Sequence, residues 1–145
     1  MTAQATWIIA ADGAKARFFV RQAPGVPLEE LADLALTATA ELRLQRHASA
    51  VHDGADHGHH ALADHHDKQD EGEHHFLSHI AGRINLAVEN HAIGRLAICA
   101  PPRALGALRD HLSPAAVRLV AAEIAKDVVR ETVCELDDRM KAHKV

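Results

Sequence analysis

The stretch that decides the fold is Leu96-Ala-Ile-Cys-Ala-Pro-Pro-Arg-Ala-Leu-Gly-Ala-Leu-Arg-Asp-His-Leu112. Its first five residues, 96–100, are all apolar and do not alternate with polar ones, which is typical of a strand buried on both faces of a sheet. Pro101 and Pro102 lack the amide hydrogen that a strand needs, so the strand ends there. Pro102 suits the first position of a helix, and the leucines that follow have helical spacing. The stretch therefore predicts a strand, a sharp turn and a helix, which is half of a parallel crossover unit.

The N-terminal part of the chain predicts neighbours for this strand. Residues 5–11 read as a second buried strand, and we expect its apolar part, Trp7 to Ala11, to pair in parallel with residues 96–100. Asp12-Gly13 is a hairpin turn signal, and residues 15–20 follow as an antiparallel strand. Leucines between residues 28 and 36 fit either a short helix or a strand, and we favour a third antiparallel strand over residues 30–37.

The middle of the chain differs in kind. Residues 41–72 are polar, lack a clear period and hold most of the 13 histidines, so we expect a long and mobile surface loop there. A helical period then runs from Glu73 to Asn90, with its start favoured by Asp70 or Glu71 and its end by Gly94 in a left-handed conformation.

The C-terminal part of the chain predicts a further helix, a last strand and a closing helix. Ser113-Pro114 is a helix start, a last strand should lie within residues 121–128, and a helix should close the chain over 129–144. The order is three strands, a helix, a strand, a helix pair, a strand and a helix. We predict an α/β fold of RNase H-like type: a mixed sheet, with an antiparallel meander plus two parallel strands, covered by helices.

Composition limits the classes of function. The chain has 145 residues, enough for one domain, and 48% of them are hydrophobic. Its formal charge of -4 argues against a dedicated nucleic-acid binder. Cys99 and Cys134 lack metal-type spacing, and Cys99 reads as a small buried hydrophobe, although a disulfide stays open. Without a signal-peptide pattern or an apolar run of about 20 residues, we expect a cytoplasmic protein with no membrane span.

Five stretches form a recognisable series along the chain: Trp7–Phe18, Gly58–Ala61, Ala100–Gly106, Leu112–Pro114 and Lys126–Asp127. In this order they resemble the host attachment proteins, bacterial relatives of the archaeal and eukaryotic peptide release factors. The resemblance implies an RNase H-like fold similar to the release-factor middle domain. The Gly-Gly-Gln tripeptide with which release factors act does not occur in the sequence. We therefore expect a binding module without enzymatic activity, with a protein or ribonucleoprotein partner such as the ribosome.

Two sets of charged residues are candidates for a site near the strand ends. Asp12 and Asp127 end the first and last predicted strands and could converge on divalent metal ions, as in a nuclease. The alternative, which we favour, is that Asp12 makes the hairpin turn and Asp127 caps the last helix. A basic rim could line the same end of the sheet, where α/β proteins commonly bind ligands, or serve as ordinary surface charge; its residues are Lys15, Arg17, Arg103 and Lys126.

Histidines suggest a second class of function, binding of Zn or Ni. Five candidates lie within the predicted loop: His57, His59, His60, His65 and His66. His75 and His79 are four residues apart, which places both on one face of a helix. No pair shows zinc-finger spacing, so the alternative is a solvated loop that binds metal adventitiously. A tight site should use the more rigid pair, His75 and His79.

Overall fold

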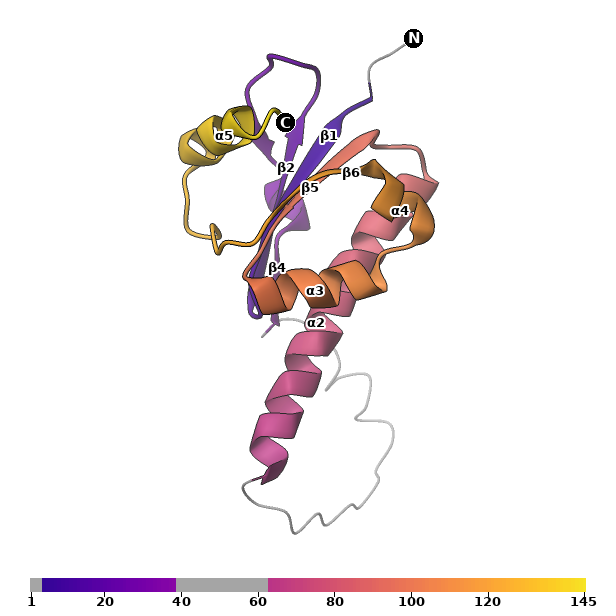
Figure 1. Ribbon diagram of the computed structural model, residues 1–145, viewed down its shortest axis with the longest axis vertical. Helices are drawn as coiled ribbons and strands as arrows, with labels where there is room; N and C mark the ends of the chain where they lie inside the picture. The colour runs from indigo at the N-terminus through magenta and orange to yellow at the C-terminus, as the bar shows by residue number, and fades with distance from the viewer. Residues whose placement is uncertain (1–3, 39–62) are drawn as a thin grey trace.

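Two parallel strands form the centre of the sheet in the computed structural model, which describes residues 4–38 and 63–145 (Figure 1). They are β1 (Thr6–Ala11) and β5 (Arg95–Cys99), with Trp7 paired to Leu96 and Ala10 paired to Cys99. Ile8, Ile9 and Ala97 have no exposed surface. The structure confirms the predicted parallel pairing of two strands that are covered on both faces. A strand made almost entirely of apolar residues fits this position, because both of its faces are shielded from water.

The remaining strands extend the sheet on both sides of this pair. β2 (Lys15–Arg21) runs antiparallel to β1, and β6 (Val120–Ile124) runs parallel to β5. The strand order is β3-β2-β1-β5-β6, where β3 is Glu29–Glu30, and β4 (Leu36–Thr37) also pairs with β2. The Asp12 carboxylate fixes the β1–β2 hairpin by accepting hydrogen bonds of 2.7 Å from the backbone N–H groups of Ala14 and Lys15. The predicted mixed sheet is confirmed.

The predicted third strand over residues 30–37 is wrong as one element. The chain forms two short strands, β3 (Glu29–Glu30) and β4 (Leu36–Thr37), with a 3-10 turn, η1 (Ala32–Leu34), between them. Leu31 and Leu34 both pack against the core, which a single strand could not achieve because residues three apart point to opposite faces. Each alternative therefore describes part of the segment: short strands form its two ends and a helical turn lies between them.

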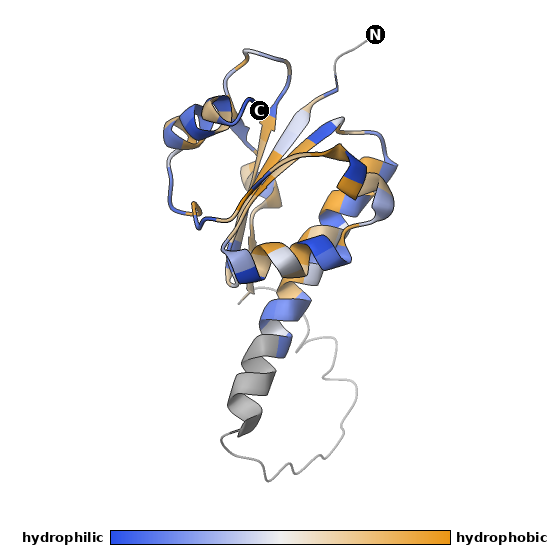
Figure 2. Ribbon diagram, viewed as in Figure 1, coloured by the Kyte–Doolittle hydropathy of each residue, from blue (hydrophilic) through white to orange (hydrophobic). Residues whose placement is uncertain are grey.

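Helices cover the two faces of the sheet unequally (Figure 1). One face carries α2 (Ala63–Glu89), α3 (Pro102–His111) and α4 (Pro114–Leu119), whereas α5 (Val133–Ala142) covers the other. Along β1, Ile9 joins the first core and Ile8 the second, as the alternation of a strand requires. Hydrophobic residues concentrate along the strands and the helix faces that meet them (Figure 2). Among the described residues, no helix is long and apolar enough to span a membrane.

Helix α2 begins ten residues earlier than predicted. Residues 63–72, assigned to the loop, are helical, whereas residues 39–62 lie outside the described part of the chain. The prediction relied on an apolar stripe, and the first turns of α2 have none. Charge spacing was the missed signal, because Asp64 and Lys68 stand at the i,i+4 separation that favours helices.

The end of α2 also differs from the prediction. His91, with φ of 55°, takes the left-handed position that we assigned to Gly94. The N–H of His91 donates to the Val88 carbonyl and that of Ala92 to the Ala87 carbonyl, the two bonds of a Schellman motif. Gly94 serves a close approach instead, since a Cβ atom there would lie 2.4 Å from the Cβ of Gln4.

The C-terminal elements follow the predicted order but are shorter. Ser113 caps α4 by accepting a 3.2 Å hydrogen bond from the Ala116 N–H, and Pro114 follows at the first helical position, as predicted. The last strand ends at Ile124, and the last helix begins only at Val133, after Thr132 as its cap. Asp127 therefore does not cap α5; its carboxylate accepts from the Val129 N–H, 3.1 Å away, in the turn before the helix.

Candidate functional site

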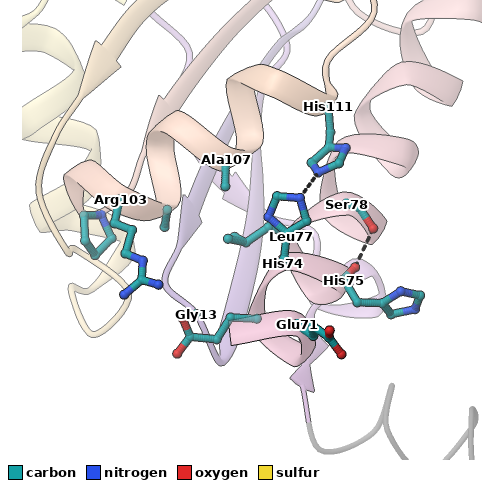
Figure 3. Close-up of a pocket in the computed structure, with 12 residues that line it drawn as sticks. Gly13, Glu71, His74, His75, Leu77, Ser78, Arg103, Ala107 and His111 are labelled. Carbon is teal, nitrogen blue, oxygen red and sulfur yellow. Dashed lines mark hydrogen bonds between the residues drawn. The ribbon is translucent and has the colours of Figure 1, made fainter. Parts of the chain in front are cut away.

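A cavity of about 660 Å³ lies between α2 and α3, next to the β1–β2 hairpin (Figure 3). We call it the α2–α3 groove, defined by Gly13, His74, Leu77, Ser78, Arg103, Ala107 and His111. Its position follows from the topology, because β1 and β5 end here and α3 starts here. The carboxyl end of parallel strands is where α/β sheets commonly bind ligands.

The groove has an apolar floor and a polar rim. Leu77 and Ala104 form part of the floor and are 4% and 7% exposed. The rim carries cationic or imidazole side chains together with carboxylates, namely His74, His75, His111, Arg103, Glu71 and Glu73. Such a cavity is within the size range of ligand sites, and its mixture of apolar surface with a few polar groups is typical of them.

Two histidines join the helices at the rim of the groove. The Nε2 atoms of His74 on α2 and His111 on α3 lie 3.0 Å apart (Figure 3). One ring donates and the other accepts, so at least one imidazole is neutral in this contact. Asn85 positions α3 for it, because its amide donates to the His111 carbonyl and its oxygen accepts from the Ser113 N–H, at 3.1 and 2.9 Å.

The hairpin closes one side of the groove through Gly13. A Cβ atom at this position would lie 2.9 Å from the Cδ of Glu73 on α2, which is too close for an unshifted side chain. Glycine therefore lets the hairpin approach the helix. Arg103 lies across the groove at the start of α3 (Figure 3).

The two predicted carboxylates, Asp12 and Asp127, line one cavity, which is separate from the α2–α3 groove. This cavity has a volume of about 380 Å³ and is also lined by Glu131 and Glu135. Each predicted carboxylate accepts hydrogen bonds from backbone N–H groups of its own turn. The turn role proposed for Asp12 is confirmed.

The predicted basic rim is distributed over several environments. Arg103 lines the α2–α3 groove, whereas Lys15 and Lys126 are exposed elsewhere. Arg17 is half-buried and makes a structural connection: its Nη1 donates to the carbonyls of Val129 and Glu131, at 2.8 and 2.7 Å. Arg17 also pairs with Glu30, so it ties the turn before α5 to the sheet.

The predicted metal ligands are described only in part. His57, His59 and His60 lie outside the described residues, and the side chains of His65 and His66 are likewise not described. His75 and His79 share one face of α2, as predicted, with ring centroids 4.5 Å apart. Over residues whose side chains the structure describes, no group of three or more His, Cys, Asp or Glu is arranged to hold a metal ion.

Sequence reasoning missed the pair His74 and His111. The two residues are 37 positions apart and no local pattern connects them. In the predicted helix His75 and His79 share one face, whereas His74, one residue before His75, falls on another face. Only the packing of α2 against α3 makes them neighbours.

Comparison with known proteins gives one clear result. A family described as "Protein required for attachment to host cells" matches residues 7–140, from β1 to α5. No curated protein matches the chain significantly. The match includes part or all of every strand and helix of the described structure. The chain thus belongs to the family of proteins required for attachment to host cells.

Proposed function

We propose that this protein is a binding module without enzymatic activity, and that it contributes to attachment by holding a partner in the α2–α3 groove. The observation that carries the proposal is the groove itself, which has an apolar floor and a rim of imidazole and guanidinium groups at the ends of the central parallel strands. The family description supports a role in attachment.

The contacts within the groove favour binding over catalysis. The Ser78 hydroxyl donates to the His75 carbonyl, 2.6 Å away, so its proton is committed to the backbone rather than to a base. His74 and His111 satisfy each other. Neither arrangement forms the nucleophile–base pair of a hydrolase. The side chains that line the groove are suited instead to contacting the surface of a partner.

The nature of the partner rests on the resemblance to release-factor relatives. We propose a protein or ribonucleoprotein partner, with the ribosome as one candidate, and an RNase H-like single domain acting in the cytoplasm. Support comes from the order of the matching stretches, such as Trp7–Phe18 and Ala100–Gly106, and from a mixed sheet in which β1, β5 and β6 are parallel. The mixed charge of the groove suits a protein surface as well as a ribonucleoprotein.

Affinity capture tests the nature of this partner. Tagged protein is used to capture partners from lysate of the source bacterium, with one half of the lysate treated with RNase first. The proposal expects one defined set of proteins at near-stoichiometric amounts. Ribosomal proteins lost after RNase treatment would support a ribonucleoprotein partner, and a single RNase-resistant protein would support a protein partner. Recovery equal to that of an unrelated tagged protein in both halves contradicts the proposal.

Metal binding is the second candidate function, and the contact between His74 and His111 favours it. Two Zn–N bonds of about 2.0–2.1 Å at a tetrahedral angle separate the nitrogens by about 3.3 Å. The observed 3.0 Å requires little opening to accept Zn or Ni. The other candidates remain His75 and His79, together with the histidines predicted from the loop pattern. At the pair formed by His74 and His111, water or a partner group would complete the coordination of the metal ion.

A further inference from the structure

We propose a second binding site, for a small molecule that carries a phosphate group, at the opposite end of the sheet from the α2–α3 groove. A cavity of about 450 Å³ lies there, and we call it the basic pocket, defined by Arg21, Arg95, Lys141 and Lys144. It adjoins the start of β1 at Thr6 and the start of β5 at Arg95. This site is independent of the proposed function of the groove.

The charge of the basic pocket stands out against the rest of the molecule. Among the residues that the structure describes, four positive side chains line it and no Asp or Glu side chain does, in a chain whose formal charge is -4. Arg21 ends β2, Arg95 begins β5, Lys141 lies in the last turn of α5, and Lys144 lies two residues beyond that helix. Such convergence on one cavity creates a local positive potential that attracts anions.

Arg21 makes this a built site rather than a chance gathering of surface charge. It is 5% exposed, and its guanidinium is fixed by a 2.6 Å ion pair with Asp137 and by a bond to the Val26 carbonyl. Its Nε atom is buried without a hydrogen-bond partner. Arg21 lines the pocket, so an anion in the cavity would lie beside a guanidinium whose position the bonds to Asp137 and Val26 already fix.

Asp137 does not neutralise the pocket. Burial alone would raise the pKa of its carboxyl, but the hydrogen bond and charge of Arg21, with a smaller contribution from Lys141, hold it below the usual value. The carboxylate is therefore ionised near neutral pH and offsets one positive charge. Four cations against one carboxylate leave an excess that suits an oxyanion.

Stabilisation of the negative pole of α5 accounts for only half of the cations. Lys141 and Lys144 stand at the end of α5, where positive charge stabilises the negative pole of a helix. Arg21 and Arg95 belong to strands, so the helix dipole does not explain them. Arginine presents its donors in a planar fork that matches phosphate oxygens, and a cavity of this size holds a small ligand rather than a polymer.

Calorimetric titration of the full chain with pyrophosphate tests the proposal. The test variant is Arg95→Gln/Lys144→Gln, which leaves the buried Arg21 in place. The control is Arg118→Gln/Lys126→Gln, which removes one arginine and one lysine from exposed positions outside the pocket. We expect wild type and control to bind one equivalent with similar affinity, and the test variant to bind about tenfold more weakly or worse.

Three results would overturn the proposal. The first is wild-type protein that does not bind pyrophosphate. The second is an equal loss of affinity in both double variants, which would indicate general charge attraction. The third is a single-stranded RNA oligonucleotide that binds through Arg95 and Lys144 while pyrophosphate does not, which would make this face a nucleic-acid contact. Circular dichroism of each variant verifies that it is folded.

Discussion

The Nε2 atoms of His74 and His111, 3.0 Å apart, join α2 to α3 across the rim of the α2–α3 groove. The rings meet edge to face, with centroids 4.7 Å apart. This contact connects the long helix to the helix that follows the central strand. Both residues also line the groove, so the contact holds the two helices together at its rim.

Zinc titration distinguishes the pair His74 and His111, which joins α2 to α3, from the pair His75 and His79 on α2. We expect His74→Ala/His111→Ala to weaken zinc binding by about tenfold or more, since the nitrogens already lie near the separation of two zinc ligands. The matched control is His75→Ala/His79→Ala, which should retain wild-type affinity. The opposite ranking would assign the site to His75 and His79. Absence of measurable binding in wild type would remove the metal-binding function.

The ion pair between Arg21 and Asp137 should contribute strongly to stability. Asp137→Asn leaves a buried guanidinium without its charged partner, and we expect a loss of about 3 kcal/mol in the free energy of unfolding at neutral pH. The folded-state pKa of Asp137 is lowered, so the contribution is present above the unfolded value of about 3.9 and is lost as pH falls through the folded value.

Urea unfolding at neutral pH and at about pH 3 measures this effect. The difference between wild type and Asp137→Asn should shrink in acid. The exposed neighbour Asp138 provides the control, because Asp138→Asn removes the same charge without removing a buried partner. Equal destabilisation by the two substitutions would show that the ion pair is not the cause.

The approach of the hairpin to α2 can be tested at Gly13. Gly13→Ala should cost about 1 kcal/mol, because its Cβ collides with the Glu73 side chain, which is flexible enough to move aside. Glu73→Ala removes the obstacle, so the double variant should be less destabilised than the sum of the single ones. Additive losses in the urea-unfolding cycle would refute the contact.

The central strands and the helix periods follow from local sequence, whereas the groove does not. Residues 7–11 and 96–100 are recognisable because burial on both faces of a strand demands an uninterrupted apolar run. Ser113 and Pro114 predict the start of α4, because serine is favoured at the N-cap and proline at the first helical position. The pairing of His74 with His111 depends on helix packing between distant segments, and the early start of α2 lacks an apolar stripe, so neither has a strong local signal.

The two cysteines should differ in reactivity. Burial raises the pKa of the Cys99 thiol to about 12, which the nearby Arg139 offsets only in part, whereas Cys134 is exposed on α5. A thiol-reactive dye at about pH 8 should therefore label one cysteine per folded chain and both in denaturant. Cys134→Ser should abolish labelling of the folded protein. Rapid labelling of that variant before unfolding would contradict the burial of Cys99.

The most direct test of the central claim compares two matched charge reversals in the affinity capture. Arg103→Glu changes the rim of the α2–α3 groove, and Arg118→Glu makes the same change at an exposed position on α4 outside it. Quantitative mass spectrometry of the captured partner is the readout. The groove account predicts that Arg103→Glu reduces recovery by about tenfold while Arg118→Glu leaves it near the wild-type level. Equal recovery with both variants, or loss confined to Arg118→Glu, would contradict the assignment of the groove as the partner site.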